Sequence, residues 1–283
     1  MKPFPYRKIT KKEAIEDYNK LVNLPEKKAL DRSNIGNKAT DYLFQKERSK
    51  VRIRGRKSHL DSWKDEQERA KIIKFAKQLR KTNNPTDADL RASIRFKHGS
   101  INQFRPAVAK WIYQRFKPKR ILDFSAGWGG RLLGAMALNI DYVGIDANTN
   151  LYPLYKKMLE IYPSDSEVKL IFKPAEEVDF KELGKFDMIF TSPPYFDLEI
   201  YPNMKNYGSS ENFLNEFFIP VVRESFKRLN KDGYLILNMP SEMKDVLKSL
   251  NICKGRIDSV KMPIANRFND GTERYELIYI CKN

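Results

Sequence analysis

The residue types at Ser192-Pro193-Pro194-Tyr195 are suited to hold a polar ligand at the end of a strand. The apolar run Met188-Ile189-Phe190 comes just before them and predicts a strand buried on both faces. Prolines donate no backbone hydrogen bond, so the chain leaves the sheet there in a stiff, extended form. Ser192 Oγ and the Pro193 carbonyl are two acceptors for the N–H groups of an amine, and Tyr195 adds a flat ring. Because open α/β sheets bind ligands at the carboxyl ends of their strands, this tetrapeptide is the first candidate site.

A glycine-rich turn follows another apolar strand earlier in the chain. Residues 120–131 read Arg-Ile-Leu-Asp-Phe-Ser-Ala-Gly-Trp-Gly-Gly-Arg and lead into a helix. Glycine lets a ligand approach the backbone closely, and the first N–H groups of a helix lack partners. Asp146 ends the next predicted strand about 20 residues after the turn, the offset at which a carboxylate accepts from two ribose hydroxyls. The alternative is that Asp146 caps the following helix.

Together these motifs resemble the amino-methyltransferases, which use S-adenosylmethionine to methylate exocyclic amines of nucleic-acid bases. Members carry Asp/Asn/Ser-Pro-Pro-Tyr and an Asp-Pro-Phe-x-Gly-x-Gly loop, where this chain has Phe-Ser in place of Pro-Phe. In that family the Ser form is mostly associated with cytosine N4 and the Asp form with adenine N6. The resemblance covers about residues 100–283. It implies an α/β class I methyltransferase fold with a Rossmann-like seven-stranded sheet that closes in an antiparallel hairpin.

The resemblance also implies site residues and a cofactor, S-adenosylmethionine. The catalytic positions are Ser192, Pro193, Pro194 and Tyr195, with the first two orienting the amine and the tyrosine stacking on a flipped base. Glu176 would meet the adenine of the cofactor, and Phe104 would pack against its methionine end; both also fit ordinary helix starts. The full set of expected cofactor contacts is Phe104, Asp123, Phe124, Ser125, Ala126, Gly127, Gly129, Asp146, Glu176 and Thr191.

Positive charge is concentrated in the first hundred residues. The chain has a net charge of +17, and residues 1–100 hold 27 Lys and Arg against 13 Asp and Glu. This asymmetry indicates a polyanion-binding region joined to a nearly neutral body. A cation occupies every even position from 46 to 56, and an extended backbone would place all six on one face. We therefore expect nucleic-acid contacts at Lys46, Arg48, Lys50, Arg52, Arg54, Arg56 and, beside the reaction centre, Phe196; the alternative for the basic segment is a solvated surface.

The charge division and the motifs together predict two regions. Residues 1–99 form a basic, mainly helical region for nucleic-acid binding and target recognition, and residues 100–283 form the methyltransferase domain. The chain lacks a long apolar run and a signal peptide, which predicts a soluble protein without a membrane partner, cytoplasmic or acting inside a host cell. Cys253 and Cys281 are too few for a disulfide framework or a zinc site and are interpreted as small buried apolar residues in a reducing interior. No metal is expected.

The expected activity is methyl transfer from S-adenosylmethionine to an exocyclic base amine in DNA, with cytosine N4 first. Adenine N6 in DNA and then base amines in RNA are the alternatives, because the basic arm suits either polymer. A glutamine-methylating enzyme would explain the motif but leave the basic region unexplained. An inactive nucleic-acid-binding relative is disfavoured by the intact glycines and Asp146. The recognition sequence, the oligomeric state and the biological role are not encoded in any pattern we recognise.

Overall fold

Seven strands form the central sheet of the computed structural model, which describes residues 2–30, 34–196, 199–201, 203–264 and 274–283. Their order is β4-β3-β2-β5-β7-β9-β8. Strands β2 to β5 and β7 pair in parallel, whereas β9 pairs antiparallel with both β7 and β8. The bounds are β2 Arg120–Asp123, β3 Asp141–Ile145, β4 Val168–Ile171, β5 Phe186–Thr191, β7 Leu229–Asn238, β8 Asp258–Ile264 and β9 Arg274–Lys282. This arrangement confirms the class I methyltransferase fold that the sequence predicts.

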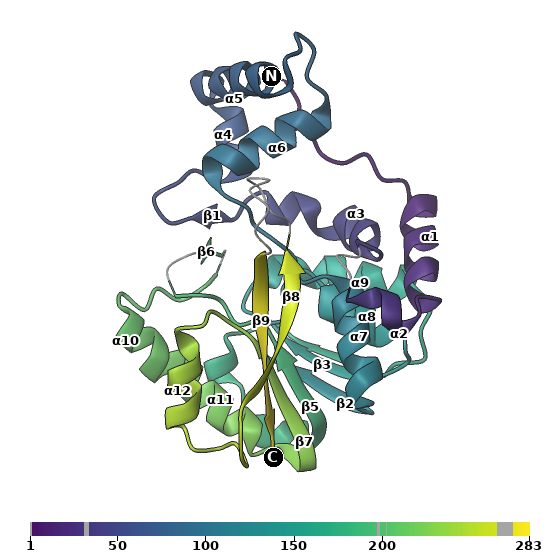
Figure 1. Cartoon of the computed structure of the whole chain (residues 1–283), viewed down its shortest axis with the longest axis vertical. Helices are drawn as coiled ribbons and strands as arrows, with labels where there is room; N and C mark the ends of the chain where they lie inside the picture. Colours follow the sequence, from purple (N-terminus) through teal and green to yellow (C-terminus); the bar gives the residue numbers. More distant parts are fainter. Residues whose placement is uncertain (1, 31–33, 197–198, 202, 265–273) are drawn as a thin grey trace.

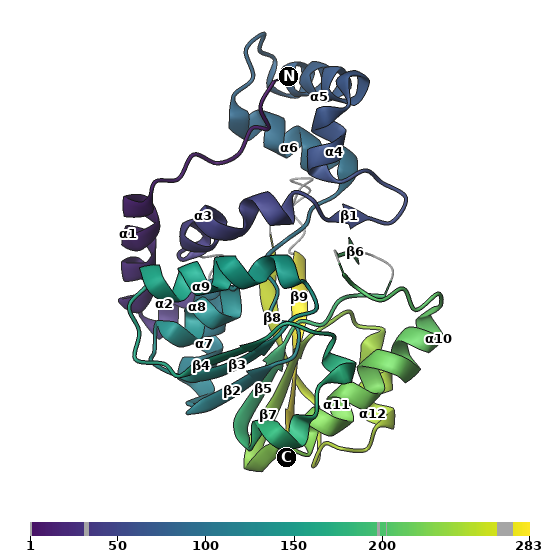
Figure 2. The same ribbon diagram turned by 180° about the vertical axis from the view of Figure 1, so that it is seen from behind.

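Helices cover both faces of the sheet, as Figures 1 and 2 show. One face carries α7 (Pro106–Phe116), α8 (Gly130–Met136) and α9 (Tyr152–Ile161), and the other carries α10 (Ser210–Phe213), η4 (Leu214–Phe218), α11 (Ile219–Phe226) and α12 (Met243–Ser249). Short turns η1 (Thr149–Leu151), η2 (Ala175–Glu177) and η3 (Phe180–Leu183) complete the connections. Met188, Ile189 and Phe190 of β5 are fully buried, because helices pack on both sides of this central strand.

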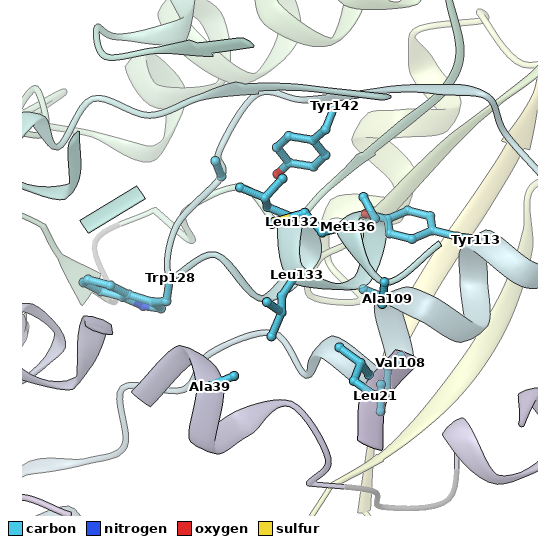
Figure 3. Close-up of a cluster of buried hydrophobic side chains, with 14 of the residues drawn as sticks. Leu21, Ala39, Val108, Ala109, Tyr113, Trp128, Leu132, Leu133, Met136 and Tyr142 are labelled. Atoms are coloured by element: carbon cyan, nitrogen blue, oxygen red, sulfur yellow. The ribbon is translucent and has the colours of Figure 1, made fainter. Parts of the chain in front are cut away.

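The first helices of the chain pack directly on this body. They are α1 (Lys11–Val22), α2 (Glu26–Ala29) and α3 (Asn37–Arg48), and a capping box of Thr10 and Glu13 begins α1. Figure 3 shows Leu21 and Ala39 beside residues of α7 and α8 in one buried cluster. The Lys110 ammonium group of α7 donates to the carbonyl oxygens of Leu21, Val22 and Leu24, at 2.7, 2.6 and 3.0 Å. The main core therefore contains residues from both sides of the predicted boundary between residues 99 and 100. That boundary stays a prediction about function.

A second, smaller core lies in residues 58–98, which we call the helical cap. It contains α4 (His59–Lys64), α5 (Glu66–Arg80) and α6 (Asp87–His98), packed around Trp63, Ile72, Ala76, Leu90 and Ile94. The two ends of the cap lie together, since His59 Nε2 is 2.8 Å from the Gly99 carbonyl oxygen. In Figure 1 the cap lies at the end of the molecule opposite the C-terminus, beyond the carboxyl ends of the parallel strands.

The basic segment 46–56 is not the continuous extended arm that we expected. Helix α3 continues to Arg48, and only the two residues of β1 (Arg52–Ile53) form a strand, antiparallel to β6 (Glu199–Ile200). Alternate residues of a helix do not share a face, because each residue turns by about 100°. The predicted single row of six cations is therefore wrong. Exposed and buried side chains alternate only around β1, where Val51 is buried and Arg52 is exposed.

Cys253 and Cys281 are joined in a disulfide bond, contrary to their interpretation as separate apolar residues. The bond links the segment after α12 to β9, whose backbones already meet because Lys254 N donates to the Lys282 carbonyl oxygen at 3.0 Å. The two cysteines are 28 residues apart along the chain, so the sequence alone does not reveal this contact.

No helix within the described ranges is long and apolar enough to cross a membrane.

Candidate active site

A cleft of about 1590 Å³ lies between the carboxyl ends of the parallel strands and the helical cap. The tips of β2, β3 and β5 contribute its floor through the turns that follow them. Residues of α3 and of the helical cap contribute the opposite wall. The cleft therefore joins the two sequence motifs to the basic N-terminal region.

The Ser-Pro-Pro-Tyr tip follows β5 and faces the cleft with all four residues. The Ser192 hydroxyl donates to Asn238 Oδ1 at 3.1 Å, and Asn238 Nδ2 donates to the Leu277 carbonyl oxygen at 3.2 Å. Because its proton is engaged, Ser192 Oγ presents its lone pairs to the cleft as a hydrogen-bond acceptor. Sequence reasoning missed Asn238; its signal is that it ends β7, the neighbour of β5.

Two carboxyl groups line the cleft beside this tip, Glu199 of β6 and Glu276 of β9. Burial raises the pKa of both, and for Glu199 the nearby charge of Glu276 adds to the rise. Glu199 accepts a hydrogen bond from the Tyr201 hydroxyl. Burial and the charge of Glu276 also raise the pKa of the Tyr195 hydroxyl, which stays neutral. This end of the cleft can therefore hold a carboxyl proton in less acidic solution than usual.

The glycine-rich turn follows β2, the strand that pairs with β5, and is locked by Asp146. Gly127 N donates to Asp146 Oδ2 at 2.7 Å, and Asn148 N donates to Oδ1 at 2.9 Å. Gly127 has a φ of +62°, which glycine adopts readily, and an added Cβ would meet only Ser125 O, at 3.7 Å, leaving the turn open to a ligand. Burial raises the pKa of Asp146 to about 6. A half-neutral carboxyl at mildly acidic pH is thus placed under the turn.

Asp123 lies beneath the turn rather than in the cleft. Its fully buried carboxylate accepts from Arg131 Nε at 2.7 Å, from the Tyr142 hydroxyl, and from Ser125 N at 3.2 Å. The Arg131 guanidinium in turn packs over the ring of Phe104, 5.5 Å from its centre. Contrary to our expectation, the Asp123 side chain is therefore not placed to contact a cofactor in the cleft. It shapes the turn instead. Sequence reasoning missed Arg131, whose only signal was a cation at the start of an apolar helix.

The structure brings most of the predicted cofactor residues into the cleft. Glu176 is among them, and it accepts a hydrogen bond from the Tyr207 hydroxyl at 2.6 Å. The lining residues are Phe104, Phe124, Ser125, Ala126, Gly127, Asp146 and Glu176, whereas Asp123, Gly129 and Thr191 do not line it. Gly129 is instead bound to α9, because its N–H donates to the Tyr155 hydroxyl at 3.1 Å.

The residues expected to bind nucleic acid are divided by the fold. Arg48 lines the cleft but pairs with Asp41 and donates to Gln103 Oε1 at 2.7 Å. Phe196 does not line the cleft; it packs 5.8 Å from the ring of Phe213, so a contact with a base in the cleft is not supported for it. The exposed cations outside the cleft are Lys46, Lys50, Arg52, Arg54 and Arg56. Their role with nucleic acid stays a prediction.

Unpartnered polar atoms beside the cleft allow a test of whether a nucleoside cofactor fits. Asn148 lines the cleft, and its buried Nδ2 finds no acceptor among the described residues. The buried Thr191 Oγ1, just before the Ser-Pro-Pro-Tyr tip, is also without a partner there. A ligand with hydroxyl and carboxylate oxygens matches the Asn148 donor and the open face of Gly127, whereas Thr191 does not line the cleft and adds nothing to this fit. The described residues contain no cluster suited to a metal ion.

The comparisons with known proteins agree only in broad shape. The sequence matches no model of a protein family and no curated protein. Among solved structures, TrmN from Thermus thermophilus superposes with a TM-score of 0.45 at 14% identity over 63% of this chain and 49% of its own. An rRNA methylase from Streptococcus thermophilus gives 0.42 at 13% identity over 65% and 99%. TehB from Haemophilus influenzae gives 0.43 at 12% identity over 68% and 65%. The chain thus spans about half of TrmN, and similarity at this level carries no inference about activity.

Proposed function

We propose that this protein is an S-adenosylmethionine-dependent methyltransferase that acts on the exocyclic amine of a nucleic-acid base, cytosine N4 in DNA first. The observation that carries the proposal is the pairing of Ser192 with Asn238 in the same cleft that the turn locked by Asp146 lines. The tip that would hold the amine and the turn that would hold the cofactor line one cleft.

The residues around the glycine-rich turn would hold the cofactor. Asp146 and Asn148 would bind its ribose hydroxyls, Glu176 its adenine, and the backbone at Gly127 its amino-acid part. Bound there, S-adenosylmethionine supplies a methyl group carried on a positively charged sulfur. The acidic floor of the cleft, with Asp146, Glu176, Glu199 and Glu276, favours a ligand of that charge.

The tip would hold the base. A base amine is a poor nucleophile because its lone pair is delocalised into the ring. Ser192 Oγ and the Pro193 carbonyl are acceptors for its two N–H groups, and holding both favours a pyramidal nitrogen whose lone pair is less delocalised into the ring. Tyr195 offers a neutral aromatic face on which the base stacks. Glu199 and Glu276, which line the cleft beside the tip, would take up the proton that the amine loses.

The transfer of isotope-labelled methyl groups tests the proposal. The substrates are duplex DNA, single-stranded DNA and RNA, digested to nucleosides and identified by mass spectrometry. N4-methylcytosine that is lost in Ser192→Ala and kept in Ser249→Ala, an exposed serine of α12, would support it. N6-methyladenine, or methylation of RNA alone, would retain the mechanism and change the target. No methylated nucleoside despite cofactor binding would overturn it in favour of a different acceptor.

A further inference from the structure

Phe96 of the helical cap is a large apolar side chain that is 58% exposed and lines the cleft. Its ring lies nearly parallel to that of Phe75, at an interplanar angle of 30° and a centroid distance of 5.0 Å. Leu79 of α5 also lines the cleft and is 50% exposed. A ring supported from below, with its outer face toward solvent, is the geometry of a stacking platform.

The charges around this platform favour a polyanion. Along the stretch 58–98, all of which is described, the residues that line the cleft include Arg91 and Arg95 but no Asp or Glu. Arg95 is exposed and directly precedes Phe96. The acidic residues that line the cleft lie elsewhere, beside the glycine-rich turn and the Ser-Pro-Pro-Tyr tip and on α1 and α3. Phosphates would therefore approach the helical cap, whereas the reactive base would point to the acidic floor.

The size of the cleft points the same way. A small-molecule pocket usually occupies about 300–1,000 Å³, and this cleft measures 1590 Å³. One cofactor and one base do not fill it. Room remains for further nucleotides between the tip and the cap.

We propose that the helical cap binds an unpaired stretch of the nucleic-acid substrate, with a base beside the target stacked on Phe96 and the adjoining phosphates near Arg95. The inference rests on the proposed function and specifies its substrate as single-stranded. In a duplex each base is already stacked on its neighbours, so an interior base has no free face for Phe96. An unpaired target also avoids the free energy of pulling a base out of its helix.

Binding of a short fluorescent oligonucleotide, measured by anisotropy without any methyl transfer, tests the proposal. We expect the single strand to bind more tightly than the same sequence as a duplex. Loss of one stacked base corresponds to about a tenfold weakening, so Phe96→Ala should raise Kd by that order. Phe96→Leu, which keeps an apolar side chain without the ring, should weaken binding similarly. Phe96→Trp should retain it, with indole fluorescence quenched by the oligonucleotide.

Tyr152→Ala is the matched control, because Tyr152 is 56% exposed but lies outside the cleft. It should leave Kd unchanged. Equal binding by Phe96→Ala and the parent, or tighter binding of duplex than of single strand, would overturn the proposal. So would a concentration-dependent dimer that Phe96→Ala abolishes, since a second copy would then cover the ring. If binding depends on Phe96 but no nucleoside is methylated, the proposed function fails and the stacking platform stands. If a nucleoside is methylated but binding does not depend on Phe96, the proposed function stands and the stacking platform fails.

Discussion

The Ser192 hydroxyl donates to Asn238 Oδ1 across 3.1 Å, which ties the tip after β5 to the end of its neighbour β7. The hydrogen bond fixes the direction in which Ser192 Oγ presents its lone pairs. Asn238 is itself 3% exposed and anchored to the Leu277 carbonyl oxygen. It is therefore a positioning residue for the candidate catalytic serine.

Asn238→Ala should lower the rate of methyl transfer about fivefold and leave cofactor affinity unchanged. The reason is that a hydrogen bond of this kind is worth about 1 kcal/mol, and its loss lets the serine hydroxyl rotate. Steady-state kinetics and cofactor titration would separate the two effects. Asn230→Ala is the control, since Asn230 lies at the other end of β7 and makes a comparable side-chain bond to Asp187 at 2.9 Å. Equal losses in both variants would mean a general weakening of the strand.

The fold was predictable from the sequence because its signals are local. The apolar run at Met188-Ile189-Phe190 and the glycines after Asp123 each act within a few residues, and both appear in the structure as expected. The structure of the basic segment was not predicted correctly. We assigned its period of two to a strand, although Lys46 and Arg48 belong to α3. Alternation of cations alone does not decide between these two backbones.

Sequence patterns indicated residues of the candidate site mainly where these follow strand ends, and their roles stay predictions. Ser192 and Asp146 were found in this way, whereas Asn238, Arg131 and Phe96 were not. Asn238 acts through a partner 46 residues away, and Arg131 through a carboxylate hidden below the turn. Phe96 resembled an ordinary helix residue until the fold showed its exposed ring beside the cleft. Such roles depend on tertiary neighbours that sequence patterns do not specify.

Cofactor affinity should depend on the protonation of Asp146. Burial raises the pKa of this carboxyl from 3.8 to about 6, so the folded protein holds its proton more tightly than the unfolded chain does, and ionisation costs stability as the pH rises between those values. The ionised form is the better acceptor for ribose hydroxyls, so affinity should rise as the pH increases through about 6. Calorimetric titration of S-adenosylmethionine over this pH range would measure it. Asp146→Asn should bind more weakly, by about tenfold or more, without this pH dependence. A parent whose affinity is flat across the range would exclude Asp146 as a ligand.

Breaking the buried pair beneath the turn should destabilise the whole domain. Arg131→Met leaves the Asp123 carboxylate buried without its cation, and such a loss costs about 3–5 kcal/mol. Denaturant unfolding would measure it, and the double variant with Asp123→Asn should recover part of the loss. Lys282→Met is the control, because its pair with Asp232, at 2.9 Å, is exposed and should contribute nothing measurable. If Arg131→Met unfolds at the same denaturant concentration as the parent, the pair is not a support of the turn.

Removal of the helical cap should separate nucleic-acid binding from the methyltransferase fold. The cap has its own core, and its ends meet where His59 Nε2 approaches the Gly99 carbonyl oxygen, so a short Gly/Ser linker can replace residues 60–97. We expect this variant to retain a cooperative melting transition and cofactor binding, and to lose single-strand binding.

Deletion of residues 2–48 is the contrast. It removes Tyr18, Leu21 and Phe44, which are at most 1% exposed in the main core, and should prevent folding. Both deletions remove cations, but only the cap-deleted protein should fold. It is therefore the variant that tests nucleic-acid binding. A cap-deleted protein that folds and still prefers the single strand would place the binding surface elsewhere, with the exposed arginines around β1 as the next candidates.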